Sequence, residues 1–122
     1  MRTENYIDGE WRKGAGALFA SHDPATGDKV WEGRAASPED VAEAMAAANL
    51  AFPAWSRLPL EERVGVVRAY AKALEAKKED FAQAISREMG KALWDARGEV
   101  AAMIGKVEIS IRAQAERAGA RE

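Results

Sequence analysis

The stretch REMGKALWDARGEV, residues 87–100, joins two long helical patterns and sets how the chain folds on either side of it. Gly90 can adopt the left-handed conformation that ends a helix, and Lys91 suits the negative end of a helix dipole. A phosphate-binding loop would need a preceding strand, a suitably spaced glycine, and a serine or threonine after the lysine. Here a helical pattern precedes the pair and Ala92 follows it, so the sequence predicts a helix stop.

Apolar residues recur at helical spacing on both sides of this stop. The last segment is predicted to run from about Leu93 to Arg117, with a main apolar stripe of Val100, Ile104, Val107 and Ile111. The stripes before the stop are Leu60, Val64, Val67, Ala71 and Leu74, and then Phe81, Ile85 and Met89 beyond a polar junction at residues 75–80.

A further helix is predicted to begin near residue 37. Ser37 suits the N-cap and Pro38 the first helical position, while Glu39 and Asp40 place negative charge in the first turn. The apolar stripe of this segment is Val41, Met45, Ala48, Phe52 and Trp55. We expect Pro53 to end this helix or to kink its last turn, and Pro59 to start the next helix.

The first third of the chain is predicted to form two β-hairpins. The motif YIDGEW places apolar residues on both sides of Asp8-Gly9, a pair typical of two-residue hairpin turns. The second hairpin turns at Pro24 and Gly27, which preset one turn torsion and allow a left-handed residue. Gly14 and Gly16 are expected to loosen the chain between the two hairpins.

These elements predict an α+β fold, with β-hairpins in residues 1–36, three or four packed helices in residues 37–118 and a polar tail at residues 119–122. Strands and helices do not alternate, so a parallel βαβ sheet is excluded for this chain alone. We treat residues 1–122 as a single unit, because that length suits one modest domain.

Composition and charge exclude several classes of function. The net charge is −2, which gives no basic field to recruit nucleic acid or an anionic membrane. The sequence contains no cysteine and one histidine, so thiolate chemistry and a histidine metal cluster are excluded within this chain. The start MRTENYIDGEW has no hydrophobic signal core, from which we predict a cytoplasmic protein.

Few residues are candidates for chemistry. His22 beside Asp23 could serve in acid–base catalysis, but no nucleophile accompanies it and a surface turn is the simpler interpretation. Four tryptophans could stack on a ligand, although packing at the edges of elements is favoured for them. They are Trp11, Trp31, Trp55 and Trp94.

A flank of the last helix is the strongest candidate site. Glu99, Ala102, Met103 and Lys106 recur at helical spacing beside the main apolar stripe. An acid, a flexible thioether and a base therefore share one surface. This flank is either a solvated face with an ordinary helical ion pair or a strip that faces a ligand.

Several motifs together resemble the beginning of the aldehyde dehydrogenase superfamily. They are YIDGEW, DPATGDKV, AFPAWSRLPLEERVGVVRAYAKAL and ISREMGKALWDARGEV, and they occur in the order and spacing of that family. The pattern of an acid, any residue and Gly-Lys, at residues 88–91, is a recurrent mark of its N-terminal region. The resemblance covers essentially all 122 residues.

The resemblance implies oxidation of an aldehyde to an acid with the cofactor NAD or NADP. In that reaction a cysteine thiolate attacks the aldehyde, hydride passes to the cofactor, and a glutamate activates water to release the acid. The family places these residues and the dinucleotide-binding segment after the present region. We therefore expect an N-terminal part of the cofactor-binding domain that is inactive alone, with no catalytic, cofactor-binding or metal-binding residue.

Within the family, EVAAMIGKVEISIRAQAERAG is most similar to the N-succinylglutamate 5-semialdehyde dehydrogenase branch. The matching residues are Met103, Lys106 and Ile109-Ser110-Ile111, whereas Gln114 replaces the aromatic residue usual in the family. This resemblance implies N-succinyl-L-glutamate 5-semialdehyde as the substrate, in arginine catabolism. It also implies that the flank at Glu99, Ala102, Met103 and Lys106 borders the substrate tunnel.

Two alternatives remain open at the level of sequence. The chain could come from another aldehyde or semialdehyde dehydrogenase branch, or it could be a self-contained helical interaction module. A fragment of an enzyme should expose large apolar patches and pair with copies of itself, so we expect a homo-oligomer. A self-contained module should bury its core unaided.

Overall fold

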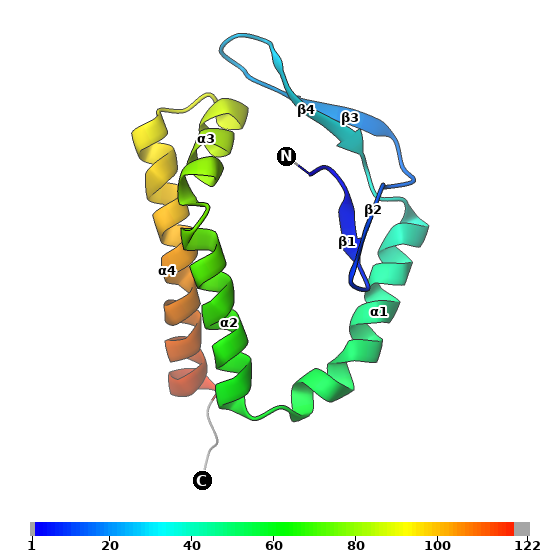
Figure 1. Cartoon of the computed structure of the whole chain (residues 1–122), viewed down its shortest axis with the longest axis vertical. Helices are drawn as coiled ribbons and strands as arrows, with labels where there is room; N and C mark the ends of the chain where they lie inside the picture. The colour runs from blue at the N-terminus through cyan, green and yellow to red at the C-terminus, as the bar shows by residue number, and fades with distance from the viewer. Residues whose placement is uncertain (1, 119–122) are drawn as a thin grey trace. The chain divides into compact units, whose positions relative to one another are not determined.

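The structure, a computed structural model, describes residues 2–118, and the predicted tail at residues 119–122 lies outside them. Two compact units divide the chain, Met1–Arg57 and Leu58–Glu122. The first contains two antiparallel strand pairs and one helix, and the second contains three helices (Figure 1). The predicted α+β class, with hairpins first and helices after, is confirmed. No helix among the described residues has the length and apolarity that crossing a bilayer requires.

The first hairpin pairs strand β1 (Asn5–Ile7) with β2 (Glu10–Arg12) around the predicted turn. Asp8 and Gly9 both have positive φ angles, 50° and 81°, as a tight two-residue turn requires. Tyr6 pairs with Trp11 across the strands, and their rings lie 5.0 Å apart between centroids. This aromatic contact covers the outer face of the hairpin, while Ile7 is buried.

The second hairpin pairs strand β3 (Leu18–His22) with β4 (Lys29–Arg34). Asp23 organises its loop, because its carboxylate accepts a hydrogen bond from the Ala25 amide and its carbonyl accepts one from the Gly27 amide. Gly27 has a φ of 79°, which confirms its predicted left-handed conformation. Phe19 and Trp31 meet edge to face across the strands, with centroids 5.0 Å apart.

The segment between the hairpins is tightly packed rather than loose. The Gly16 amide donates to the Ala35 carbonyl at 2.8 Å. At Gly14, a Cβ atom would lie only 2.2 Å from the same carbonyl oxygen. The prediction that Gly14 and Gly16 loosen the chain is therefore wrong, because both glycines permit a close approach of two backbone segments.

Helix α1 (Pro38–Arg57) begins with a reciprocal cap. The Asp40 amide donates to Ser37 Oγ at 3.2 Å, and the Ser37 amide donates to Asp40 Oδ2 at 2.8 Å. The same oxygen accepts the Ala15 amide at 2.8 Å, which ties the start of the helix to the segment between the hairpins. The predicted N-cap is confirmed, and Asp40 completes a capping box.

Proline 53 does not end α1, which continues to Arg57. A proline four residues before the end of a helix removes one backbone hydrogen bond, and the last turn tolerates that loss. The helix contains no buried residue, and the large side chains of its predicted stripe are exposed: Val41, Met45, Phe52 and Trp55. The amphipathic pattern in the sequence therefore predicted the helix correctly, but the apolar face of the helix is exposed in the structure.

The cap gives a direct test of this helix start. Replacing Ser37 with alanine should lower the free energy of unfolding by about 1 kcal/mol, because the Asp40 amide loses its acceptor. The measurement is urea denaturation followed by circular dichroism. Ser56→Ala near the other end of α1 is the matched control, expected to change stability by less than about 0.5 kcal/mol. Equal effects of the two variants would contradict a capping role for Ser37.

The Asp40 carboxylate makes the stability of the fold depend on pH. The pKa of Asp40 is lowered from its ordinary value of 3.8, first by the hydrogen bond from the Ala15 amide and then by that from the Ser37 amide. Because the pKa of Asp40 is lower in the folded chain than in the unfolded chain, its ionised form stabilises the fold. This contribution is complete at pH values above the pKa of the unfolded chain. This contribution is lost as the pH falls through the lowered pKa of the folded chain.

In the second unit, α4 (Leu93–Arg117) lies alongside α2 (Leu60–Glu75) and α3 (Lys78–Met89) (Figure 1). The break between α2 and α3 consists of residues 76 and 77 only, so most of the predicted junction at residues 75–80 is helical, whereas the predicted bounds of α4 are confirmed. The buried cluster of this unit consists of Ala82, Ala96 and Val100, with Ile85, Leu93 and Ile104 packed against it. Small residues at the crossing let the backbones of α3 and α4 approach closely.

The predicted stripe of α3 is partly wrong. Met89 is largely exposed and Phe81 is at the border of exposure, whereas Ala82, outside the predicted stripe, is fully buried. The close contact with α4 selects a face with a small residue, and periodicity of large apolar residues does not reveal that choice. The predicted stripe of α4 is confirmed, since Val100 and Val107 are buried and Ile104 and Ile111 are half-buried.

Candidate functional site

The turn between α3 and α4 is the helix stop that the sequence predicts. Gly90 has a φ of 64°, in the left-handed region, and the Lys91 amide donates to the Ser86 carbonyl at 3.2 Å. Ser86 Oγ in turn donates to the Lys91 carbonyl at 2.7 Å. These bonds satisfy the Ser86 carbonyl in the last turn of α3 and tie Lys91 to that turn, directly before Ala92 at the start of α4.

The side chain of Lys91 has a role that the sequence did not reveal. Its Nζ lies 2.5 Å from Asp95 Oδ2 and also forms an ion pair with Glu99 Oε1. The hydrogen bonds that Lys91 donates raise its pKa, the bond to Asp95 having the larger effect and the bond to Glu99 the smaller. Lys91, which follows the end of α3, thus binds two carboxylates on successive turns of α4, those of Asp95 and Glu99.

The four predicted site residues share one flank of α4. Glu99, Ala102, Met103 and Lys106 are all exposed, while Val100 and Val107 on the neighbouring face are buried. We call these four residues the α4 strip. Spacings of three and four residues bring their side chains onto one surface, as predicted.

The charges of the α4 strip are not paired with each other. The Glu99 carboxylate pairs with Lys91. Within residues 2–118, no carboxylate forms an ion pair with Lys106. The strip therefore presents one acid that is paired with Lys91, an apolar centre at Ala102 and Met103, and one cation available to a ligand.

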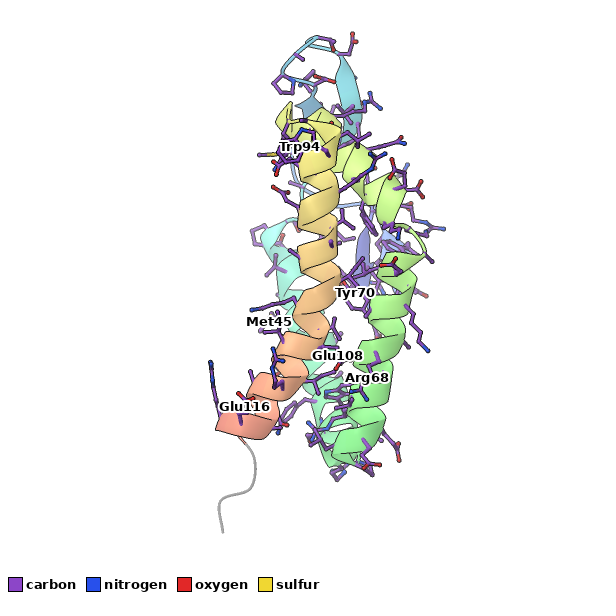
Figure 2. The ribbon with its side chains drawn as sticks, turned by 90° about the vertical axis from the view of Figure 1, so that its left-hand side faces the viewer. Met45, Arg68, Tyr70, Trp94, Glu108 and Glu116 are labelled. Carbon is purple, nitrogen blue, oxygen red and sulfur yellow. The ribbon has the colours of Figure 1, made fainter. Side chains whose placement is uncertain are left out.

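Two further ion pairs attach α4 to the helices beside it. Arg68 of α2 forms a two-bond pair with Glu108 of α4, with distances of 2.8 and 3.2 Å (Figure 2). Arg97 of α4 forms a similar pair with Glu79 of α3, at 3.0 and 2.8 Å. Each carboxylate has a pKa lowered first by its arginine hydrogen bond. These fork-shaped pairs fix the position of α4, and with it the strip.

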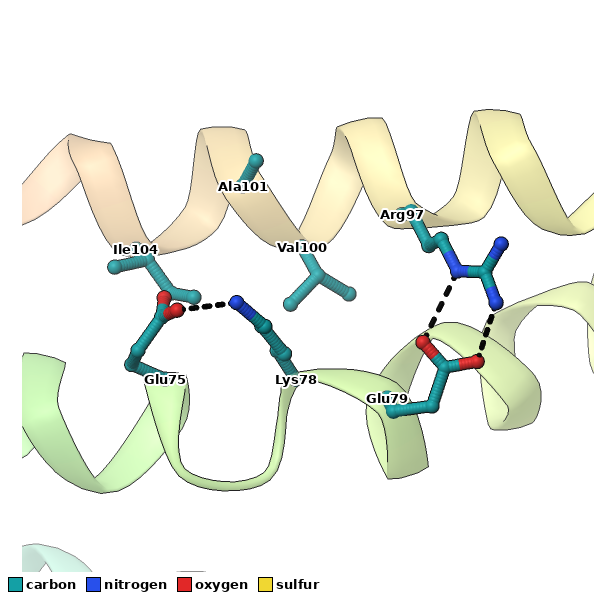
Figure 3. Close-up of a pocket in the computed structure, with 7 residues that line it drawn as sticks. All are labelled: Glu75, Lys78, Glu79, Arg97, Val100, Ala101 and Ile104. Atoms are coloured by element: carbon teal, nitrogen blue, oxygen red, sulfur yellow. Dashed lines mark hydrogen bonds and ion pairs between the residues drawn. The ribbon is translucent and has the colours of Figure 1, made fainter.

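A pocket of about 440 Å³ lies where the break between α2 and α3 meets α4 (Figure 3). Its apolar part comes from α4, and its polar part consists of the Glu79–Arg97 pair and a Lys78–Glu75 pair at 2.6 Å. The lining residues are Glu75, Lys78, Glu79, Arg97, Val100, Ala101 and Ile104. Because every cation in the pocket is paired with a carboxylate, the pocket has no free charge for a ligand.

The remaining candidates lie apart from the α4 strip in sequence and show no site of their own. His22 is exposed at the end of β3, as the interpretation as a surface residue predicts. Trp31 packs against Phe19, but Trp94 is 75% exposed, so the prediction that all four tryptophans are packed is wrong. Within residues 2–118, no three histidine, aspartate or glutamate side chains converge on a metal position.

The hairpins, the helix order and the turn at Gly90 match the opening of one family of enzymes. A family model described as "Aldehyde dehydrogenase family" matches residues 11–122. The chain therefore belongs to the aldehyde dehydrogenase family, and the resemblance found in its sequence is confirmed.

Two relatives with similar sequences carry the same enzyme name. N-succinylglutamate 5-semialdehyde dehydrogenase 2 of Caulobacter vibrioides is 53% identical over 117 residues, which cover 96% of this chain and 24% of that protein. N-succinylglutamate 5-semialdehyde dehydrogenase of Burkholderia mallei is 53% identical over 119 residues, covering 98% of this chain and 24% of that protein. The chain thus spans about a quarter of the length of these relatives and corresponds to their N-terminal part.

Solved structures give the same family. A NAD-dependent benzaldehyde dehydrogenase from Corynebacterium glutamicum aligns with a TM-score of 0.85 and 25% identity, over 94% of this chain and 25% of that chain. A succinate-semialdehyde dehydrogenase from Burkholderia pseudomallei aligns with a TM-score of 0.76 and 33% identity, over 82% and 21%. The hairpin and helix arrangement is therefore that of the aldehyde dehydrogenase fold.

Proposed function

We propose that this chain is part of an NAD-dependent aldehyde dehydrogenase that oxidises N-succinyl-L-glutamate 5-semialdehyde to N-succinyl-L-glutamate in arginine catabolism. The observation that carries this proposal is the 53% identity, across nearly the whole chain, to relatives of that name. The run MIGKVEISI, residues 103–111, supports the same branch, because it contains Met103 and Lys106 of the α4 strip.

The 122 residues are proposed to be inactive alone. They contain no cysteine, so the thiolate that the family uses to attack an aldehyde is not supplied by this chain. The residues described here also do not fit a dinucleotide, because their strands form antiparallel hairpins and offer no glycine-rich turn from a parallel strand into a helix. The proposed use of NAD or NADP rests instead on the cofactors named for related structures.

The α4 strip is proposed to face the aldehyde in the intact enzyme. Lys106 is exposed, and within residues 2–118 it pairs with no carboxylate, so its ammonium group can bind a carboxylate of a succinylated substrate. Ala102 and Met103 provide an apolar, adaptable surface for the methylene chain. The ion pairs Arg68–Glu108 and Arg97–Glu79 support a role of the α4 strip in substrate binding, because they attach α4 to α2 and α3.

Replacing Lys106 with alanine in the intact enzyme that carries this segment tests the proposal. We expect KM for N-succinylglutamate semialdehyde to rise about tenfold with little change in kcat, since a charge-assisted contact to the substrate is lost. Steady-state kinetics of NADH formation provide the measurement. Lys72→Ala, which removes an exposed lysine of α2, is the matched control and should leave KM unchanged. An unchanged KM in the Lys106 variant would remove the strip from substrate binding.

We also propose a homo-oligomeric enzyme in the cytoplasm. Support for association comes from the exposed apolar side chains of α1, which no described residue buries. Contiguous apolar surface of this kind is usually covered by another part of the protein or by another copy. The same exposed surface disfavours the alternative of a self-contained interaction module, which would bury its core unaided.

A further inference from the structure

We infer that Lys91 is a positioning residue for the α4 strip, which it prepares for an anionic aldehyde by binding Glu99 and offsetting part of its negative charge. This inference rests on the proposed function, because it assumes that the strip faces the substrate. Glu99 is the acid of the strip, and its unpaired charge would repel a substrate that carries carboxylates. Pairing with Lys91, which also binds Asp95, reduces that repulsion and leaves Lys106 as the unpaired cation of the surface.

The geometry gives Lys91 two anionic partners on the side of α4 that carries the strip. Asp95, Glu99 and the strip residues that follow recur at spacings of three and four residues, so they line one surface. The Lys91 side chain is 23% exposed, while the Glu99 side chain is 51% exposed and accessible to an approaching ligand. The lysine is thus less exposed than the carboxylate that it binds, and that carboxylate stays accessible to solvent.

Distance along the helix determines which carboxylate matters to the ligand. Glu99 precedes Lys106 by seven residues, or about 10 Å of helix rise, whereas Asp95 precedes it by about 16 Å. Screening at physiological salt acts over about 8 Å, so an anion bound at Lys106 should sense Glu99 more strongly than Asp95. Without Lys91, this surface would carry two unpaired carboxylates beside the proposed cation.

The competing explanation is that Lys91 only stabilises the turn between α3 and α4. Its ammonium group bridges the first turns of α4, and its backbone is part of the helix stop at Gly90. A purely structural role would impair every substrate equally and would not depend on the charge of Glu99. The two explanations therefore differ in their dependence on substrate charge and in the effect of a second substitution.

The test is a double-mutant cycle in the intact enzyme. Lys91→Gln should raise KM for the anionic aldehyde N-succinylglutamate semialdehyde about fivefold with kcat nearly unchanged. KM for the neutral aldehyde propanal should change less than about twofold, which also reports that the variant is folded. Adding Glu99→Gln should restore KM for the anionic aldehyde, whereas adding Asp95→Asn should restore it less.

Three results would overturn the inference: an equal rise in KM for both aldehydes, no restoration by Glu99→Gln, or equal restoration by Asp95→Asn. If Lys91→Gln fails to fold, Lys91→Met takes its place, since methionine has a similar length and no charge. It should raise KM for the anionic aldehyde by the same factor of about five. An equal rise in KM for propanal would overturn the inference.

Failure of the proposed function has a different signature. In that case Lys106→Ala would leave KM unchanged, or N-succinylglutamate semialdehyde would not be oxidised at all. The cycle is then run with succinate semialdehyde against propanal, two aldehydes that differ in charge. Charge-dependent restoration by Glu99→Gln would still support neutralisation by Lys91, and its absence would reject it.

Discussion

Replacing Gly14 with alanine is expected to unfold the N-terminal unit, Met1–Arg57. The added Cβ would lie 2.2 Å from the Ala35 carbonyl oxygen and 2.7 Å from that of Arg34. Both are backbone atoms, so no side-chain rotation relieves the overlap and the two segments must separate. We expect a loss of about 3 kcal/mol or more in the free energy of unfolding. Urea denaturation followed by tryptophan fluorescence measures it, since Trp11 and Trp31 report on this unit.

Gly65→Ala in α2 is the matched control for this substitution. A Cβ at Gly65 would meet no atom within 4 Å, and its φ is not positive. Alanine favours a helix more than glycine does, so the control should gain about 0.5–1 kcal/mol. If Gly14→Ala were as stable as the parent, the two segments would not be in the close contact described here.

Replacing Val100 with aspartate is expected to disrupt the packing of α4 against α3. Val100 is 1% exposed and lies in a cluster with Ala82 and Ala96 that contains no polar partner for a carboxylate. Burying an unpaired charge there should cost about 4 kcal/mol, or unfold the unit outright. Val100→Ala, which leaves only a small cavity, should cost about 1–2 kcal/mol. Thermal denaturation followed by circular dichroism compares the three proteins.

Ala102→Asp provides the control for charge alone, because it places a carboxylate on an exposed position of the same helix. We expect its stability to lie within about 0.5 kcal/mol of the parent. Similar melting temperatures for Val100→Asp and the parent would mean that α4 does not bury this face against α3.

Local chemistry predicted the hairpins and the helix ends well. Asp8-Gly9 determines a tight turn because few other pairs accept two positive φ angles, and the structure has both. Ser37 and Gly90 determine a helix start and a helix stop through hydrogen bonds made within a few residues. In each case the interacting groups are neighbours in sequence, so the residue type alone carries the information.

Interactions between distant residues were not predictable in the same way. Gly14 permits a contact with Ala35, and its residue type alone does not distinguish close packing from flexibility. The choice of Ala82 over Phe81 for burial depends on how closely α3 approaches α4. The ion pair from Lys91 to Glu99 depends on the angle at which α4 leaves the turn, and the pocket beside Val100 depends on the break between α2 and α3.

The position of the α4 strip was predictable, but its electrostatics were not. Helical spacing placed Glu99 and Lys106 on one flank, and the structure agrees. The sequence left open whether that flank carries an ordinary helical ion pair or faces a ligand. The structure pairs Glu99 with Lys91, a residue that precedes α4, and leaves Lys106 without a carboxylate partner among residues 2–118.

The carboxylate of Asp40 makes the entry to the second hairpin and the first turn of α1 a single cooperative element. One oxygen accepts the amides of both Ala15 and Ser37, residues more than twenty positions apart. Fraying of the helix start therefore releases the amide of Ala15 at the same moment. The amide protons of Ala15 and Ser37 should therefore exchange with solvent in one opening event. The segment between the hairpins and the first turn of α1 would then unfold together, although they belong to different elements of secondary structure.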